Sequence, residues 1–313
     1  YNEIRGLRVK YLSADPSNPE DGQVWYNSTT GNLRVKGVAI AAFASAAALP
    51  TGTSTYNRAG TMTAGLFAGG NTSTGFSTAT YEWNGSGWTS GGAIGTALYS
   101  NTGFGTQTAG ASAAGRPTNG SSGDTNATFE YDGSSWTSVN AANLAARTRQ
   151  SFGIQTAAAM VGGFSQSGGS YTNATEEYDG TNWTTVTVMP AATASANAIG
   201  TQTAAIVSLG GAPTVATTYV AYDGTNWTSS PSANIARARS AAGGTGATST
   251  AGLVIGGTPY NPSVVAETWD GTSWANSASI TTARYGAGVS DGNTNGIIAG
   301  GRTAPGFETA VEE

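Results

Sequence analysis

The sequence contains no cysteine and no histidine. The chain therefore cannot form disulfides or thiolate metal sites, and it lacks the commonest general base and the commonest metal ligand. Charged residues make up only 10% of the chain, and the formal net charge is -5. An acidic protein with few basic residues repels phosphates, so we expect no binding to nucleic acid.

Long apolar runs are also absent. The longest one, Val38 to Pro50, is shorter than the roughly 20 residues that a membrane-spanning helix needs, so we expect no membrane insertion. No stretch has the heptad or three-and-four spacing of a long amphipathic helix. Glycine is abundant, at 46 of 313 residues, and Thr, Ser, Ala and Asn fill much of the remainder. This composition predicts an all-β protein of the extracellular type.

The most informative feature is repetition. Tryptophans that follow an Asp-Gly or Asn-Gly pair succeed one another in steps of 48, 47, 44 and 47 residues, at Trp88, Trp136, Trp183, Trp227 and Trp274. An apolar run ending in Gly-Gly recurs in phase with them, at Gly69, Gly162, Gly210, Gly256 and Gly300, with Gly115-Arg116 as a degraded copy. A period near fifty residues predicts an array of similar β units.

Each repeat predicts four short strands, A to D. In the third repeat these strands begin at Arg149, Ala157, Asn173 and Asn182. Gln155-Thr156 and Asp179-Gly180 fall between strands, where tight hairpin turns are needed, and Asp-Gly suits the positive φ of such a turn. Gly-Gly lets backbones approach closely. We expect Tyr178 and Trp183 to fill the gap between neighbouring units rather than to contact a ligand.

This pattern resembles the kelch family of β-propellers, in which Gly-Gly ends the second strand, a tyrosine lies in the third and a tryptophan opens the fourth. The matching residues are Gly162-Gly163, Tyr178 and Trp183, and the resemblance covers residues 38–313. Two units depart from it, with Trp83 and Trp269 in place of the tyrosine. The resemblance implies a six-bladed propeller.

The sixth unit lacks a fourth strand, because the chain stops at Glu313 before any tryptophan. A propeller left open would expose unpaired strand edges. Counting back from Gly69 by the spacing of the other repeats places a candidate strand at Val38–Ala47. We therefore expect a six-bladed kelch-like β-propeller closed by this N-terminal strand, with residues 284–313 supplying the other three. The segment Val24–Val35 is the alternative for that role.

Residues 1–37 differ from the rest, with a net charge of +1 against -6 for residues 38–313. Here "QVWYN" and "NLRVKG" around Thr-Thr-Gly predict a short β-hairpin arm. The stretch "DGQVWYN" resembles short segments of bacteriophage tail-fibre and other virion proteins that lie near attachment regions. The resemblance implies an arm that attaches to other virion proteins through residues 1–37; the alternative is an ordinary hairpin packed against the propeller.

One side of the predicted propeller carries the B-to-C and D-to-A loops, which vary from unit to unit, whereas the A-to-B and C-to-D turns recur almost unchanged. Variable loops on a constant scaffold suit recognition. Aromatic rings beside Asn, Ser and Thr suit sugars, although such rings can also pack under a neighbouring unit. The candidate binding residues in these loops are Phe76, Arg116, Phe164, Tyr171, Tyr260, Arg302 and Phe307.

A second candidate set consists of arginines at or near the start of strand A in four units. We expect them to ring the mouth of the central channel, where guanidinium groups could hold carboxylated or sulfated glycans or the acidic tail of a partner. In the alternative interpretation each pairs with an acid or with carbonyls of its own unit. The four are Arg58, Arg149, Arg239 and Arg284.

No set of residues predicts an enzyme or a cofactor. The adjacent acids Glu176-Glu177 and Glu312-Glu313 point to opposite faces of a strand, so neither forms a glycosidase pair. Our hypothesis is a non-enzymatic phage virion surface or tail-fibre protein, extracellular and part of a larger assembly. It would display the propeller for host-surface glycan recognition or virion decoration. The alternative is a bacterial extracellular surface or filament subunit assembled through propeller faces.

Overall fold

The computed structural model describes residues 9–16, 23–35, 42–54, 57–117, 123–208, 213, 218–230, 243–257, 262–290, 296–303 and 306–313. Arg239 and Tyr260, two of the candidate residues, lie outside these ranges. All regular elements within them are strands, and none contains a helix long and apolar enough to cross a membrane. The chain divides into unit 1, Tyr1–Ala41, and unit 2, Ala42–Glu313.

Unit 1 contains a three-stranded sheet. Strands β2 (Val24–Asn27) and β3 (Asn32–Val35) form the predicted hairpin, and β1 (Lys10–Leu12) adds in parallel to β2, which the sequence did not predict. Asn27 Oδ1 closes the hairpin turn by accepting the backbone N–H groups of Thr29 and Thr30, each at 3.1 Å. Because the segment Val24–Val35 pairs within its own unit, the alternative in which it completes the last sheet of the repeat array is wrong.

Unit 2 contains six four-stranded antiparallel sheets in the part of the chain that is described, and we number them 1 to 6 in chain order. Sheet 1 is β5 (Asn57–Thr61), β6 (Ala64–Ala68), β9 (Thr80–Trp83) and β10 (Trp88–Gly91). Sheet 2 is β12 (Thr102–Gly105), β13 (Gly110–Ala113), β15 (Thr128–Tyr131) and β16 (Trp136–Val139). Sheet 3 is β17 (Gln150–Ile154), β18 (Ala157–Val161), β21 (Thr175–Tyr178) and β22 (Trp183–Val186).

The remaining sheets follow the same plan. Sheet 4 is β23 (Asn197–Thr201), β24 (Ala204–Ser208), β25 (Tyr219–Tyr222) and β26 (Trp227–Ser230). Sheet 5 is β27 (Gly243–Thr248), β28 (Ala251–Ile255), β29 (Ala266–Trp269) and β30 (Trp274–Asn276). Sheet 6 is β31 (Gly288–Ser290), β32 (Ile297–Ala299), β33 (Val311–Glu312) and β4 (Ser45–Ala46). The four strands predicted for the third repeat are thus confirmed as sheet 3.

Sheet 6 joins the two ends of unit 2. Strand β4 pairs antiparallel with β33, with Val311 opposite Ala46 and Glu312 opposite Ser45. Reciprocal backbone hydrogen bonds between Ala44 and Glu313, at 2.8 and 2.9 Å, extend this pairing. The sequence predicted this partnership between residues 38–47 and residues 284–313.

Neighbouring sheets are connected by a set of side-chain hydrogen bonds that recurs with the repeat. The strand-C tyrosine donates its hydroxyl to a strand-C glutamate of the preceding sheet, in the pairs Tyr131–Glu82 (2.5 Å), Tyr178–Glu130 (2.9 Å) and Tyr222–Glu177 (2.8 Å). The strand-D tryptophan donates Nε1 to a strand-C threonine of that same sheet, in the pairs Trp136–Thr80, Trp183–Thr128 and Trp227–Thr175. The prediction that these tyrosines and tryptophans fill the gap between neighbouring repeats is therefore confirmed.

The A-to-B turns contribute a third connection. Gln155 Nε2 reaches back to sheet 2 and donates to Gly110 O (3.0 Å) and Tyr131 O (3.3 Å). Gln107 and Gln202 make the corresponding bonds to sheets 1 and 3. Sequence reasoning assigned this glutamine only to the turn, so its part in joining the sheets was missed.

The C-to-D turns have the predicted Asp-Gly conformation. Gly180 has φ +92°, and Asp179 Oδ1 accepts the N–H groups of Thr181 (2.8 Å) and Asn182 (2.7 Å). Asp132, Asp223 and Asp270 close the corresponding turns in the same way. Hydrogen bonds from the turn stabilise the ionised form of the carboxylate. They lower the pKa of Asp132 to about 2.

Gly-Gly pairs end strand B with two positive φ values, +61° at Gly162 and +110° at Gly163. In sheet 2 the corresponding residues are Ala114 (φ +58°) and Gly115 (φ +106°). The sequence alignment that put Gly115-Arg116 at this position was therefore one residue out of phase. Ala114 adopts the left-handed conformation that glycine takes at this position in sheets 1, 3, 5 and 6.

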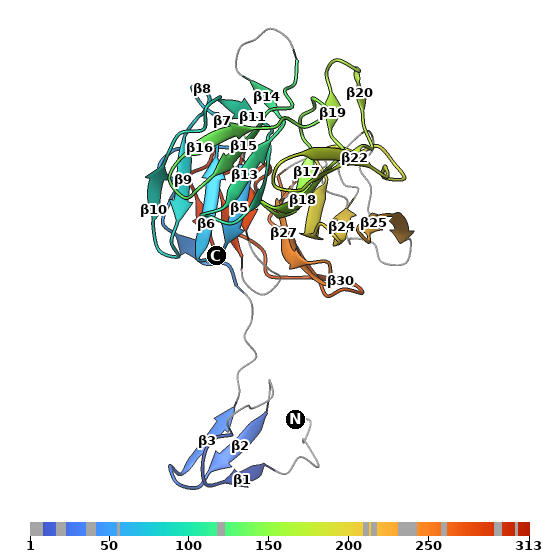
Figure 1. Ribbon diagram of the computed structural model, residues 1–313. Coiled ribbons are helices and arrows are strands. Elements are labelled where there is room, and N and C mark those ends of the chain that lie inside the picture. The colour runs from blue at the N-terminus through green and yellow to red at the C-terminus, as the bar shows by residue number, and fades with distance from the viewer. Residues whose placement is uncertain are drawn as a thin grey trace. The chain divides into compact units, whose positions relative to one another are not determined.

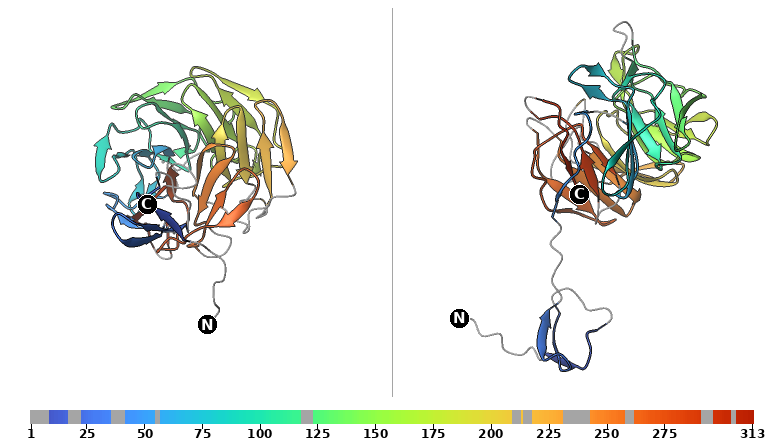
Figure 2. Two further views of the ribbon diagram at one scale, coloured as in Figure 1. Left: turned by 90° about the horizontal axis from the view of Figure 1, so that it is seen from below. Right: turned by 90° about the vertical axis from the view of Figure 1, so that its left-hand side faces the viewer.

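The second residue of each described pair also joins neighbouring sheets through the backbone. The N–H of Gly163 donates to Thr193 O (2.7 Å) on the way into sheet 4, and that of Gly70 donates to Leu98 O (2.8 Å) on the way into sheet 2. The sheets of unit 2 consequently follow one another around a common centre in chain order (Figures 1 and 2). This all-β arrangement is β-propeller-like.

Candidate binding face

Two of the strand-A arginines are inside the protein. Arg149 and Arg284 are 1% and 0% exposed, and each forms an ion pair with a strand-C glutamate of its own sheet, Glu176 and Glu312. The expectation that they present guanidinium groups at a channel mouth is wrong for these two residues. Each of them instead pairs with an acid of its own repeat, as the alternative interpretation held.

The surroundings of Arg149 explain why a buried charge is tolerated there. Its Nη2 donates to Met160 O (3.2 Å), and Glu176 Oε1 accepts the N–H groups of Asn143 (2.7 Å) and Leu144 (3.0 Å). Burial lowers the pKa of Arg149, and the carboxylate of Glu176 opposes that change. This ion pair ties strand A to strand C and to the loop that leads into the sheet.

Arg58 differs from the other two. It lies on β5, two positions further along strand A than Arg149 does on its own sheet, and it is half-buried. Its Nη2 lies 3.4 Å from Gln150 Oε1 of sheet 3, so the side chain extends past sheet 2. Arg58 is therefore the described strand-A arginine whose guanidinium links sheets across the centre.

The candidate loop residues that the structure describes lie on one side of unit 2. Three short two-stranded sheets gather there: the hairpins β7–β8 (Asn71–Thr72 and Gly75–Phe76) and β19–β20 (Phe164–Ser165 and Ser170–Tyr171), and the pair β11–β14 (Leu98–Tyr99 and Arg116–Pro117) (Figure 1). Together with single bridges they place residues opposite one another in cross-strand rows. We call these the sheet-1 row (Ser54, Asn71, Phe76), the sheet-2 pair (Tyr99, Arg116), the sheet-3 row (Arg147, Phe164, Tyr171) and the sheet-6 row (Tyr285, Arg302, Phe307).

The sheet-3 row is a fixed cluster. Arg147 lies over the ring of Phe164 at 4.6 Å, and Phe164 meets Tyr171 edge-on with ring centres 5.2 Å apart. Arg147 Nη1 donates to Asp124 Oδ1 (2.8 Å), and Asp124 Oδ2 accepts the N–H of Gln166 (2.7 Å). Tyr171 remains 39% exposed at the outer end of the row. The row therefore presents the ring of Tyr171 to solvent, above an arginine whose charge is neutralised by Asp124.

The sheet-6 row has the same composition in a different order. Arg302 exchanges backbone hydrogen bonds with Tyr285, at 2.8 and 3.1 Å, and bridges to Phe307 on its other side. Its guanidinium carbon lies 4.8 Å from the centre of the Phe307 ring. Arg302 thus has an aromatic residue directly opposite it on both neighbouring strands.

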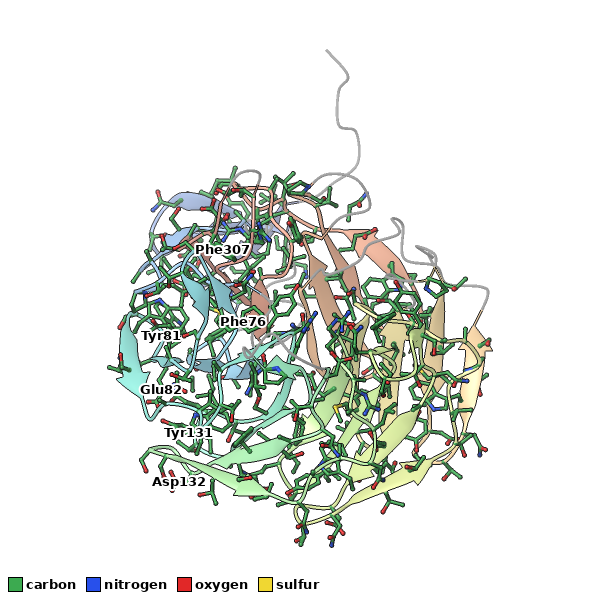
Figure 3. The ribbon with its side chains drawn as sticks, turned by 90° about the horizontal axis from the view of Figure 1, so that it is seen from above. Phe76, Tyr81, Glu82, Tyr131, Asp132 and Phe307 are labelled. Carbon is green, nitrogen blue, oxygen red and sulfur yellow. The ribbon has the colours of Figure 1, made fainter. Side chains whose placement is uncertain are left out.

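Two candidates are engaged with neighbours. The ring of Phe76 stacks on Tyr99 of the next repeat, with ring centres 5.2 Å apart and planes 15° apart. Phe76 thus packs against a neighbouring repeat, as the alternative interpretation held. Arg116 lies directly opposite Tyr99. Figure 3 shows Phe76 and Phe307 on this face over adjoining parts of unit 2.

Sequence reasoning missed the four residues of the rows that come from the D-to-A loops, Ser54, Tyr99, Arg147 and Tyr285. A signal for part of the arrangement was present. Phe76, Tyr171 and Phe307 each lie four residues before the start of strand C, so position in the repeat already grouped them. No repeat position marked Arg147 or Tyr285, because the D-to-A loops differ in length.

Among the described residues no three acidic side chains gather where a metal ion could be held. No protein-family model matches the sequence, and no curated protein matches it. A solved structure titled "Structure of YjhT" is similar, with a TM-score of 0.69 over 85% of this chain and 96% of that chain, at 15% identity. At this identity the similarity supports the β-propeller-like fold alone.

Proposed function

We propose that unit 2 is a closed, six-bladed propeller of the kelch type in which β4 supplies the last strand. Two contacts support closure. Trp88 Nε1 of sheet 1 donates to Ala47 O beside β4 (2.8 Å), as Trp227 does to Thr187 O after strand D of sheet 3 (3.0 Å). The N–H of Gly301 in sheet 6 donates to Thr53 O (2.8 Å), the link that Gly163 makes with the sheet after its own.

We infer that the chain is a non-enzymatic surface or tail-fibre protein of a phage virion, extracellular, that recognises host-surface glycans through the face carrying the rows. The observation that carries this inference is a contrast within one repeat. The Tyr–Glu, Trp–Thr and Gln–carbonyl contacts recur between sheets, whereas the rows on one face differ from sheet to sheet. A constant scaffold with a variable face is the layout of recognition proteins.

Unit 1 would serve as the attachment arm. Its sheet is held around Asp15, which accepts Trp25 Nε1 (2.8 Å) and Asn27 Nδ2 (2.9 Å). Apolar side chains on the other face are exposed, among them Tyr11 at 74% and Leu33 at 66%. A small sheet with an uncovered apolar face fits a segment that packs against another protein of the assembly.

A cryo-EM map of the native particle that carries this chain tests the proposal. We expect density for unit 1 inside a capsid or tail assembly and the rows facing outward. Propellers stacked face to face along a cellular filament, with the rows buried between copies, would contradict it. A second experiment removes residues 1–41. We expect the truncated chain to fold as unit 2 and to be absent from the particle.

A further inference from the structure

The rows of sheets 3 and 6 contain the same residue types, one arginine and two aromatics, but they differ in how the arginine is neutralised. In the sheet-3 row Asp124 provides a carboxylate 2.8 Å from Arg147, and the Asp124 side chain is 1% exposed. In the sheet-6 row no acid of the described part of the chain pairs with Arg302. The nearest acid in sequence, Glu308, accepts the hydroxyl of Thr303 (2.8 Å).

Arg302 is also incompletely bonded. Its Nε is buried and has no hydrogen-bond partner within the described residues. A guanidinium has five donors in one plane that match a carboxylate, and stacking on an aromatic ring uses the face of the guanidinium and not these donors. Phe307 on one neighbouring strand and Tyr285 on the other fix the position of Arg302.

Other described arginines of unit 2 are already engaged by the fold. Arg149 and Arg284 are buried in ion pairs, Arg147 is paired with Asp124, and Arg58 contacts Gln150. Arg116 stands in the sheet-2 pair with a single aromatic opposite it. Among the described residues, the sheet-6 row therefore combines an arginine and two aromatic residues without a carboxylate paired to the arginine.

We propose that the sheet-6 row binds the carboxylate of an acidic sugar, a uronic acid residue of a surface polysaccharide. Arg302 donates to the carboxylate, and Phe307 and Tyr285 contact the apolar face of the sugar ring. Asp124 in the sheet-3 row is the internal counterpart of that ligand, because it shows how a carboxylate meets an arginine in a row of this composition. The inference rests on the proposed glycan recognition and names its chemical class.

Calorimetric titration of the full chain with an oligogalacturonate, and with the same oligosaccharide after reduction of its carboxyl groups, tests the inference. We expect binding of the acidic form that weakens with added salt, and binding of the reduced form at least about tenfold weaker, because a charge-assisted pair is lost. Arg302→Gln should weaken binding of the acidic form by a similar factor, and Arg302→Lys by less.

Two further variants sharpen the result. Arg34→Gln removes one positive charge from unit 1, where Arg34 is 45% exposed, and should leave the affinity unchanged. Asp124→Asn releases Arg147 and should create a second site for the acidic sugar, raising the stoichiometry. Circular dichroism of each variant establishes that it is folded.

The outcomes separate this inference from the proposed function. Equal affinity for the acidic and reduced forms, or an Arg302→Gln variant that binds like the wild type, overturns the acidic-sugar assignment and leaves glycan recognition standing. Absence of binding to either form overturns the assignment as well, while the place of unit 1 in a virion is decided independently by the particle map.

Discussion

At the residue scale, the tyrosines between sheets join packing to electrostatics. Tyr131 is fully buried, and its hydroxyl donates to Glu82 of the preceding sheet. Burial, followed by the hydrogen bond to Glu82, raises the pKa of Tyr131 to about 12. The pKa values of Tyr178 and Tyr222 are raised for the same reasons. The neutral phenol is thus the form that the folded protein requires.

This arrangement predicts a loss of stability in alkali. The folded pKa of Tyr131 lies above the unfolded value of about 10. Its contribution is therefore complete below about pH 10 and lost as the pH rises towards about 12. Tyr131→Phe should cost about 1–2 kcal/mol at pH 8, from the lost hydrogen bond to a carboxylate. The difference from wild type should shrink towards pH 12 in urea unfolding. Glu82→Gln should reduce the same pH dependence, and a difference that stays constant with pH would contradict the assignment.

The buried pair Arg149–Glu176 gives a second prediction. Glu176→Gln leaves a charged guanidinium in a site that is 1% exposed, so we expect a loss of about 3–5 kcal/mol in unfolding free energy. Replacing both residues, as in Arg149→Met with Glu176→Leu, removes the charge as well and should restore much of the loss. Chemical denaturation of the two variants decides it, since equal losses would show that the charge is not the cause.

At the element scale, the end of strand B shows what the repeat requires and what it tolerates. Gly162 and Ala114 occupy the same place in sheets 3 and 2, with φ of +61° and +58°. A Cβ on Gly162 would lie 2.4 Å from Thr193 O. Alanine thus tolerates the left-handed conformation in sheet 2. In sheet 3 there is also no space for a Cβ next to Thr193 O.

Gly162→Ala should therefore destabilise the protein by about 1–3 kcal/mol, from backbone strain and crowding. In the matched variant Ala114→Gly, relief of strain is offset by the larger entropy of the unfolded chain, so we expect a change below about 1 kcal/mol. Thermal unfolding of the two variants measures this. A harmless Gly162→Ala would mean that the contact with Thr193 relaxes freely.

Sequence reasoning was successful where a residue type has one local use. Asp179-Gly180, Tyr178 and Trp183 were placed correctly because turn geometry and large ring size leave few alternatives. It failed where a contact joins residues from different positions in the repeat. The pairs Arg149–Glu176 and Arg284–Glu312 lie 27 and 28 residues apart, a regularity visible in the sequence but uninformative until strands A and C are known to share a sheet. The rows pair residues of the B-to-C loops with residues of the D-to-A loops, and no repeat position marked the D-to-A partners Arg147 and Tyr285.

At the scale of the whole molecule, the last four-stranded sheet of unit 2 is completed by a strand of two residues. Strand β4 covers the edge of β33, and the neighbouring Ala47 and Leu49 connect sheet 6 to sheet 1 and to its buried core. Without β4 the edge of β33 would be open for pairing with another chain. The N-terminal segment of unit 2 therefore matters more to its stability than its length indicates.

Two truncations test this dependence. Removal of residues 1–41 takes away unit 1 and should leave the melting temperature of unit 2 unchanged. Removal of residues 1–47 also takes away β4 and should lower the melting temperature by several degrees and promote self-association. Calorimetry and sedimentation compare the two, and a synthetic peptide of residues 42–54 should reverse the second effect. Equal melting temperatures would show that β4 is dispensable.

The position of β4 has a mechanical consequence. The covalent path from unit 1 enters the sheets of unit 2 at this strand, so tension applied through unit 1 would first load the hydrogen bonds between β4 and β33. Those bonds would yield before the longer strands of sheets 1 to 5. In the proposed role of a host-binding protein on a particle, the pairing between β4 and β33 would be the place where unit 2 opens under hydrodynamic drag.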